Sequence, residues 1–257
     1  MPAFNLAVNI SGFIGAGKSH ALDFLEKRLS SEENFCSLSK EPLSIWNHSG
    51  SHRHILGLFD AYVKYPEIYT YQFQNLVFAT HLMLDHQSHQ DAKNMAKYFK
   101  RSILLREGSV KHSLVFTEAN ARKFMMSEFA CVKEFASEID LRVTQPDFTV
   151  YVDTPFSTCL ERMKQRNRPN ECKYDTLFLE ELYSRFEQMK LDIPTDKIIV
   201  VKSDTDLENC AQFLLHKLYD KSHLGTRIGA SCTCASGTVE PESGEELAST
   251  VEETESS

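Results

Sequence analysis

The segment Gly12-Phe-Ile-Gly-Ala-Gly-Lys-Ser19 decides the fold of this chain. It matches the phosphate-loop pattern of glycine, four residues and Gly-Lys-Ser without a mismatch. An apolar run at residues 4–10 predicts a strand before it, and an amphipathic segment at 20–29 predicts a helix after it. Backbone N–H groups, the helix dipole and the ammonium of Lys18 all attract phosphate oxygens, and the Ser19 hydroxyl suits a magnesium ion. The segment therefore predicts binding of a nucleoside triphosphate.

The composition is that of an ordinary globular protein of 257 residues, 42% of them hydrophobic and 25% charged. A formal net charge of −8 argues against a broad nucleic-acid-binding surface, because phosphate backbones require a basic footprint. No apolar run approaches the roughly 18 residues that span a bilayer. The first predicted strand begins at about the fourth residue and leaves no room for a signal peptide. We therefore expect a cytoplasmic protein without a membrane or nucleic-acid partner.

Two further features concern the cysteines and the carboxyl-terminal segment. The seven cysteines lack C-x-x-C spacing, so we expect free thiols, and Cys232-Thr-Cys234 lacks histidine partners for zinc. Residues 226–257 are rich in Ser, Thr, Gly, Ala and Glu and hold seven glutamates against one arginine. Such a composition buries too little apolar area to offset ordering entropy. We expect one folded domain at residues 1–222 and a disordered acidic tail at 223–257.

Short apolar segments alternate with longer helical patterns along the first 222 residues. This alternation is typical of an α/β protein whose parallel sheet carries helices on both faces. We predict five strands, at residues 4–10, 34–40, 113–117, 147–153 and 197–202. We predict helices at residues 20–29, 55–65, 69–86, 92–106, 121–137, from 154 onward, 178–189 and 207–219.

A carboxylate follows the second predicted strand, where Glu41-Pro42 ends it because proline cannot continue a central strand. Ligands of open α/β sheets bind beyond the carboxyl ends of the strands. Glu41 is therefore expected to act on a molecule bound beside the phosphate loop.

Three arginines occur within seven residues, Arg162, Arg166 and Arg168, and Pro169 follows them. A solvated basic helix face is the ordinary explanation of such a cluster. In a protein with a phosphate loop, guanidinium groups also neutralise the charge that develops during phosphoryl transfer. We therefore expect these arginines to bind the triphosphate together with the loop residues Gly12, Gly15, Ala16, Gly17, Lys18 and Ser19.

Taken together, four motifs over about residues 4–220 resemble those of the deoxyribonucleoside kinase family, which includes deoxycytidine, deoxyguanosine and thymidine kinases. The phosphate loop is the first. The second is Glu41-Pro-Leu-Ser-Ile-Trp46, similar to a Glu-Pro-x-x-x-Trp pattern, and the third is Tyr71-Gln-Phe-Gln74, similar to a Phe-Gln helix. The fourth runs from Leu160 to Glu171 and is similar to an arginine lid. The resemblance implies a P-loop kinase fold.

The resemblance also implies roles for individual residues. Glu41 would be the general base that takes the proton of the 5′-hydroxyl, and Gln74 would pair with the edge of the base. These roles suit the chemistry, because a planar amide offers one donor and one acceptor and aromatic faces stack on flat rings. The remaining substrate-binding residues would be Trp46 and Phe73 as walls of the nucleoside site, and Tyr62 and Glu171 at the 3′-hydroxyl.

The sequence departs from the family pattern in two places. The family carries an acid and an arginine after its third strand, where the acid helps to hold magnesium; the preferred match here, Glu118-Ala119, lacks the arginine. Arg122 would then serve in its place. An alternative registration uses Arg106-Glu107-Gly108-Ser109, but Gly108 is predicted to end a helix. The second departure is His81, where family members specialised for deoxycytidine carry arginine, so the base preference stays open.

The resemblance implies an ATP-dependent, magnesium-requiring kinase that phosphorylates the 5′-hydroxyl of a deoxyribonucleoside of the thymidine or deoxycytidine class. A homodimer is expected by analogy with the family. A thymidylate-type nucleoside monophosphate kinase is one alternative, although Glu41 would repel an acceptor phosphate. The other alternative is a protein that binds nucleotides without catalysis, because Ala119 stands where the family carries an arginine.

Overall fold

Five parallel strands form the central sheet of the protein. The computed structural model describes residues 4–47, 57–168 and 174–227. The strands lie in the order β2-β3-β1-β4-β5, and every neighbouring pair is parallel. The five strands are β1 (Leu6–Ser11), β2 (Asn34–Ser39), β3 (Arg101–Glu107), β4 (Phe148–Val152) and β5 (Ile198–Val201).

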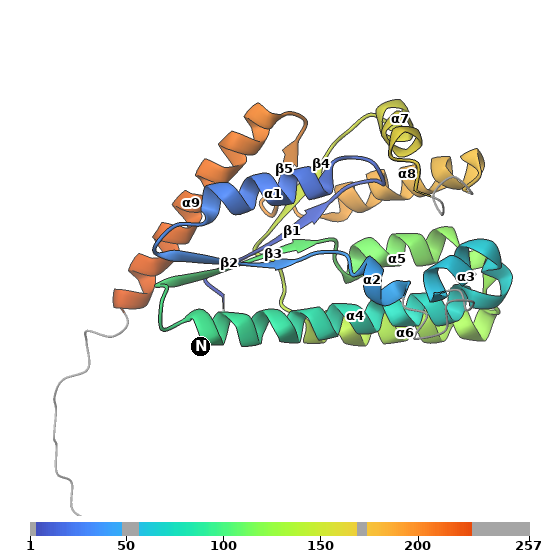
Figure 1. Cartoon of the computed structure of the whole chain (residues 1–257), viewed down its shortest axis with the longest axis horizontal. Helices are drawn as coiled ribbons and strands as arrows, with labels where there is room; N and C mark the ends of the chain where they lie inside the picture. The colour runs from blue at the N-terminus through green and yellow to red at the C-terminus, as the bar shows by residue number, and fades with distance from the viewer. Residues whose placement is uncertain (1–3, 48–56, 169–173, 228–257) are drawn as a thin grey trace, which may run out of the picture.

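Helices cover both faces of this sheet. In Figure 1, α1 and α9 lie on one face and α4 and α6 on the other. The helices are α1 (Lys18–Leu29), α2 (Leu43–Trp46), α3 (Leu58–Lys64), α4 (Pro66–Met95), α5 (Val110–Ala119), α6 (Met126–Arg142), α7 (Phe156–Arg166), α8 (Thr176–Asp192) and α9 (Asp204–Arg227), with a 3-10 turn, η1, at Ala121–Lys123. The predicted α/β class, with five parallel strands and helices on both faces, is confirmed.

Successive side chains of β1 point to opposite faces of the sheet and pack against the two layers of helices. Leu6, Val8 and Ile10 are fully buried in the cluster that joins β1 to α1 and α9. Ala7 lies on the opposite side, in a smaller cluster with Ala92 of α4. Because both faces of β1 are buried, its sequence is mostly apolar, as is usual for a central parallel strand, with Asn9 and Ser11 as buried polar residues. The phosphate loop therefore starts from the middle of a rigid sheet.

The predicted helix at residues 92–106 is wrong, because the second half of that segment is strand β3. Helix α4 continues for 30 residues to Met95, and the chain then enters the sheet between β1 and β2. The run Ile103-Leu104-Leu105 is buried on both faces and does not alternate. Periodicity alone cannot distinguish such a strand from a buried helical segment.

The predicted strand at residues 113–117 is also wrong, since these residues belong to helix α5. Gly108, with φ of +78°, turns the chain after β3, and the side chain of Ser109 caps the helix by accepting a hydrogen bond from the His112 amide. Val115 and Thr117 are β-branched, which favours a strand, but the burial of α5 among its neighbours overrides this weak preference. Consequently Glu118 does not follow a strand.

The ends of several elements also differ from the predictions. The helix predicted at 121–137 is divided into η1 and α6, and the last helix, predicted to end at residue 219, extends to Arg227. Residues 228–257 of the predicted tail, including Cys232 and Cys234, lie outside the described residues. Within the described part of the chain, no helix is both long and apolar enough to cross a membrane.

Candidate active site

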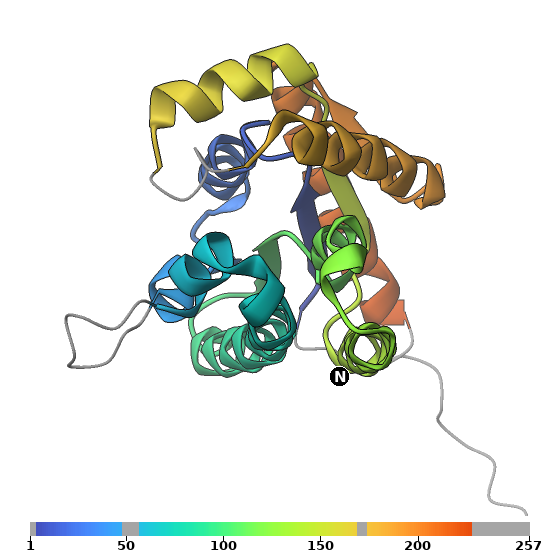
Figure 2. The same cartoon turned by 90° about the vertical axis from the view of Figure 1, so that its right-hand side faces the viewer.

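One large cavity, with a volume of about 610 Å³, opens at the carboxyl ends of β1, β2 and β3. The phosphate loop and the start of α1 form one part of its wall, and α7 adds arginines above them. Residues of α2, α3, α4 and α5 form the rest. In Figure 2, the helices α3 and α4 and the helices α7 and α8 lie on opposite sides of the end of β1. The cavity therefore lies where the topology brings these elements together.

The backbone of the phosphate loop is adapted to bind an anion. Gly17 caps α1 in the left-handed region at φ of +109°, where a side chain would be strained. Gly15, at φ of +80°, passes so close to α7 that an added Cβ would lie 2.6 Å from the carbonyl oxygen of Cys159. The Nζ of Lys18 donates to the carbonyl oxygens of Gly12 and Phe13 at 3.1 and 3.2 Å. The loop thus holds the Lys18 ammonium beside the N-terminus of α1, where an anion is expected to bind.

Two carboxylates reach the cavity from neighbouring strand ends. Glu41 follows β2, and Glu107 is the last residue of β3 and accepts a hydrogen bond from the Ser19 hydroxyl at 3.0 Å. Desolvation raises the pKa of Glu41, and the charge of Glu107 raises it further, whereas Lys18 and the lid arginines oppose the shift. Glu41 is thereby a stronger base than an exposed glutamate, as suits a group that must accept a proton near neutral pH.

The oxygen donors beside the loop fit a magnesium ion. Mg²⁺ prefers hard oxygen ligands and is bound in nucleotide sites by one or two carboxylates together with phosphates and water. Ser19 and Glu107 provide a hydroxyl and a carboxylate within hydrogen-bonding distance of each other. The described residues contain no cluster of three or more metal-binding side chains, and a magnesium ion shared with a nucleotide does not require one.

The predicted arginine cluster lies over the phosphate loop. Nη1 of Arg162 donates to the carbonyl oxygen of Ala16 at 2.8 Å and to that of Gly15 at 3.4 Å. Arg166 and Arg168 line the same cavity, and their charges lower the pKa of Glu41. A guanidinium cluster and a loop lysine thus converge on one end of the cavity.

Aromatic rings form the wall at the other end of the cavity. The ring of Tyr62 stacks on Phe73 with centroids 4.7 Å apart, and Trp46 meets Phe73 edge-on at 5.7 Å. Phe59, which the sequence analysis did not single out, stacks on Tyr62 and completes the cluster. The Tyr62 hydroxyl accepts a hydrogen bond from the Nδ2 of Asn120 at 3.0 Å, and burial raises the pKa of Tyr62 to about 12. The wall is flat, apolar and uncharged.

Neutral hydrogen-bonding groups connect α4 to α5 beside this wall. Gln74 lines the cavity, and its Oε1 accepts a hydrogen bond from Thr117 at 3.0 Å. Two helical turns further, the Nε2 of His81 lies 2.8 Å from the Ser113 hydroxyl. Desolvation, reinforced by the charge of Arg106, lowers the pKa of His81 to about 3. His81 is therefore uncharged at physiological pH.

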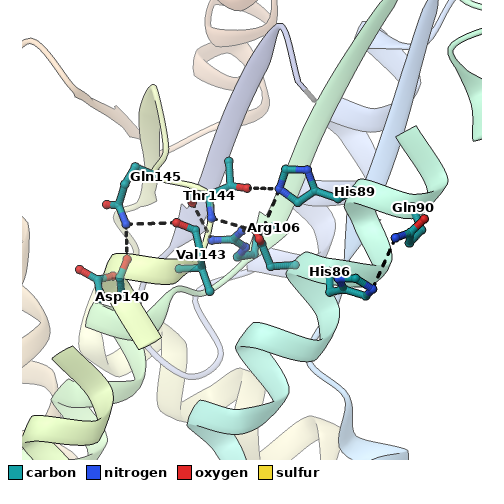
Figure 3. A network of polar contacts seen from close by, with 9 residues as sticks. His86, His89, Gln90, Arg106, Asp140, Val143, Thr144 and Gln145 are labelled. Carbon is teal, nitrogen blue, oxygen red and sulfur yellow. Dashed lines mark hydrogen bonds and ion pairs between the residues drawn. The ribbon is translucent and has the colours of Figure 1, made fainter. Parts of the chain in front are cut away.

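A buried ion pair anchors the strand that carries Glu107. Arg106 points away from the cavity, because successive strand residues face opposite sides, and its guanidinium pairs with Asp85 of α4. Arg106 also donates to the carbonyl oxygen of Thr144 at 3.2 Å, whose amide donates to Asp85 at 3.0 Å. Figure 3 shows His89 completing this network through the Thr144 hydroxyl. The network joins β3, α4 and the segment after α6.

Most of the residues predicted from the sequence meet in the cavity. Gly12 and Ala16 belong to the loop but do not line the cavity, and Glu171 lies outside the described residues. The predicted site residues that line the cavity are Gly15, Gly17, Lys18, Ser19, Glu41, Trp46, Tyr62, Phe73, Gln74, Arg162, Arg166 and Arg168.

Two further predicted residues, Glu118 and Arg122, lie away from both the loop and the cavity. Glu118 lies in the last turn of α5 and forms ion pairs with Lys133 at 3.3 Å and Arg185 at 3.6 Å. Arg122 is exposed on η1. Both assignments depended on a strand at 113–117 that is in fact a helix. The residue at the end of the third strand is Glu107, which agrees with the alternative registration Arg106-Glu107-Gly108-Ser109. The apolar run before Arg106 is the sequence feature that could have predicted this strand.

Comparisons with known proteins agree with this geometry. A family model described as deoxynucleoside kinase matches residues 8–219. The thymidine kinase of Ictalurid herpesvirus 1 (strain Auburn) is 27% identical over 182 residues, which are 69% of this chain and 71% of that protein. The solved structure of deoxyadenosine kinase from M. mycoides with bound dCTP has a TM-score of 0.61 at 18% identity and covers 84% of this chain and 100% of its own. The same enzyme with bound dATP has a TM-score of 0.59 at 19% identity and covers 83% and 100%. The chain belongs to the deoxynucleoside kinase family and is an ATP-dependent phosphotransferase.

Proposed function

We propose that the protein transfers the γ-phosphate of ATP to the 5′-hydroxyl of a pyrimidine deoxyribonucleoside, of the thymidine or deoxycytidine class. One observation carries the proposal: Glu41, the phosphate loop and the aromatic wall line a single cavity. A base, a phosphate site and a flat apolar site for a nucleobase are thereby side by side. The thymidine kinase relative supports a pyrimidine substrate.

In the proposed reaction, the nucleoside 5′-oxygen forms a bond to the γ-phosphorus while the bond between that phosphorus and the β,γ-bridging oxygen breaks. Glu41 accepts the hydroxyl proton, and ADP leaves with the bridging oxygen. Lys18 and the arginines Arg162, Arg166 and Arg168 offset the negative charge on the phosphoryl oxygens. Such reactions depend mainly on positioning and charge neutralisation, which agrees with the four cationic side chains around the loop.

Ser19 and Glu107 are the residues that would hold magnesium. When bound, the ion would neutralise phosphate charge and orient the β- and γ-phosphates. The Ser19 hydroxyl already points at the Glu107 carboxylate, so both ligands are arranged by the loop and by the end of β3.

The nucleoside is proposed to bind along the aromatic wall. Trp46 and Phe73 would contact the base, and Tyr62 would lie at the sugar. Gln74 would form paired hydrogen bonds with the base edge, since an amide presents a donor and an acceptor in one plane. Glu171, which the family resemblance assigns to the 3′-hydroxyl, follows the lid arginines in sequence.

A homodimer and a cytoplasmic location are also part of the proposal. The homodimer rests on analogy with the family. Free cysteines at positions 36, 131, 159 and 210 support a reducing compartment.

The test is a transfer assay of the purified full-length protein with ATP, magnesium, the four deoxynucleosides and thymidylate. We expect phosphorylation of thymidine or deoxycytidine, and loss of about 10³-fold or more in Lys18→Ala, because this lysine supplies the charge at the transferred phosphate. The variant should unfold at the same temperature as the wild type and serves as the control for a contaminating kinase. Transfer only to thymidylate, or equal activity of Lys18→Ala, would refute the proposal.

A further inference from the structure

The side-chain amide of Gln74, which lines the cavity, forms a hydrogen bond to a residue behind the cavity wall. Thr117 of α5 is fully buried and does not line the cavity, and its Oγ1 donates to the Oε1 of Gln74 at 3.0 Å. Gln74 is 2% exposed, and its Nε2 has no hydrogen-bond partner among the described residues. The carbonyl oxygen of the amide is thus held against α5.

The hydroxyl of Thr117 has an alternative acceptor, because the carbonyl oxygen of Ser113 lies 3.3 Å away in the preceding turn of α5. A hydroxyl carries a single hydrogen. If that hydrogen were given to Ser113, Thr117 would instead accept from the amide nitrogen of Gln74, and the amide would be turned by 180°. The shorter distance to Oε1 corresponds to the first arrangement. In that arrangement the Thr117 hydroxyl holds the carbonyl oxygen of the Gln74 amide on its side.

We propose that Thr117 is a positioning residue that fixes the polarity of the Gln74 amide, and that this polarity discriminates 4-oxo from 4-amino pyrimidine nucleosides. The inference rests on the proposed function, in which Gln74 pairs with the base edge.

The chemical basis is the order of donors and acceptors on the two bases. Thymine presents an acceptor at position 4 and an N–H donor at position 3, whereas cytosine presents an amino donor at position 4 and an acceptor at position 3. An amide of fixed polarity, facing a base whose sugar is held in one place, can form both hydrogen bonds with only one of the two bases. With the other base, it places donor against donor and acceptor against acceptor. Sites that read a base edge by hydrogen bonds discriminate strongly when a group is left unpaired.

His81 and Ser113, near Gln74, carry no charge that could discriminate between the two bases in place of the amide. His81 and Ser113 pair with each other at 2.8 Å across the same two helices. His81 is neutral, because burial and the nearby Arg106 lower its pKa to about 3. Gln74 and Ser113, which both line the cavity, are uncharged as well. Amide polarity is then the feature that distinguishes the two base edges.

The experiment compares wild type with Thr117→Val, Thr117→Ala and Thr117→Ser. Valine and alanine remove the hydroxyl, and serine keeps it as the matched control. For each protein, kcat and KM are measured with thymidine and deoxycytidine, and Kd for both is measured by calorimetry without ATP. Thermal unfolding identifies variants that fold, and two hydroxyl-free variants are included in case one does not.

We expect the wild type to prefer one nucleoside, and the preference to fall about tenfold in Thr117→Val and Thr117→Ala, the value of roughly one buried hydrogen bond. The change should appear as a lower KM for the disfavoured nucleoside with kcat nearly constant, and Thr117→Ser should retain the wild-type ratio. A purely structural role would weaken both nucleosides equally and would not be rescued by serine.

Equal affinity of the wild type for both nucleosides would overturn the inference. An unchanged ratio in the hydroxyl-free variants, or a serine variant that loses the preference, would also overturn it. Absence of transfer to any nucleoside would refute the proposed function alone, because the ratio of the two Kd values still tests the role of Thr117.

Discussion

The two ends of the cavity differ in how their side chains are held. At the phosphate end, Lys18 and Arg162 donate to carbonyl oxygens of the loop itself, so Lys18 is fixed within one short stretch of backbone and Arg162 is fixed to that stretch from α7. At the nucleoside end, the neutral Gln74 is held by the hydroxyl of Thr117 on another helix, and Ser113, which also lines the cavity, pairs with the neutral His81 behind it.

In the proposed function, the two ends of the cavity bind their ligands in different ways. The phosphate end would recognise charge, which acts over several ångströms and tolerates small displacements. The nucleoside end would recognise the order of donors and acceptors, which requires hydrogen-bond geometry. We therefore expect substitutions at the phosphate end to reduce turnover with every nucleoside. Substitutions at the nucleoside end should alter affinity or selectivity instead.

After Lys18→Ala, the largest loss of turnover is expected for Glu41→Gln. This substitution keeps the shape of the side chain and removes the proposed general base. Turnover should fall about 10²-fold or more with thymidine and deoxycytidine alike. Desolvation raises the pKa of Glu41, so the acidic limb of kcat/KM in the wild type should lie above the ordinary glutamate value of 4.5 and should vanish in the variant. An unchanged rate would remove Glu41 from the proposed mechanism.

The stability of the same variant provides its control. A carboxyl whose pKa is raised by folding binds its proton more tightly in the folded state, so its contribution to stability is present at low pH and is lost as the pH rises through the folded pKa. Glu41→Gln should therefore be at least as stable as the wild type at pH 7, and the difference should disappear below pH 4.5. Urea unfolding at the two pH values measures this.

The next effect separates the two candidate magnesium ligands. Glu107→Gln should lower turnover about 10- to 100-fold and raise the magnesium concentration required for half-maximal rate, because a ligand near Ser19 is weakened. Glu118→Gln is the matched control, since its ion pairs with Lys133 and Arg185 lie outside the cavity. A larger effect at Glu118 than at Glu107 would contradict the placement of the ion.

The smallest effect concerns the neutral end. Folding lowers the pKa of His81 from 6.5 to about 3, so its contribution to stability is present above pH 6.5 and is lost as the pH falls from 6.5 toward 3. His81→Asn, which can still pair with Ser113, should lose roughly 5 to 10 °C less in Tm than the wild type between pH 7 and pH 4.5. Equal losses in both proteins would show that His81 does not titrate as proposed.

Residues that were predicted from short local motifs do line the cavity. The phosphate loop and the arginines after residue 160 lie in short motifs, and Glu41 follows a strand that ends at a proline. Prediction failed between residues 92 and 120, where β3 was taken for a helix and α5 for a strand. Both segments are apolar and buried on more than one side, so neither shows a clear period.

The amino-acid sequence was sufficient to predict the α/β class, the phosphate loop and the family, because glycine geometry, lysine charge and strand–loop–helix order are encoded within a few residues. Only the tertiary structure decided that Glu107, and not Glu118, lies beside Ser19, and that Thr117 holds Gln74. These pairs are separated by 88 and 43 positions along the chain. Contacts at such separations arise from the packing of whole helices and strands, which no local pattern specifies.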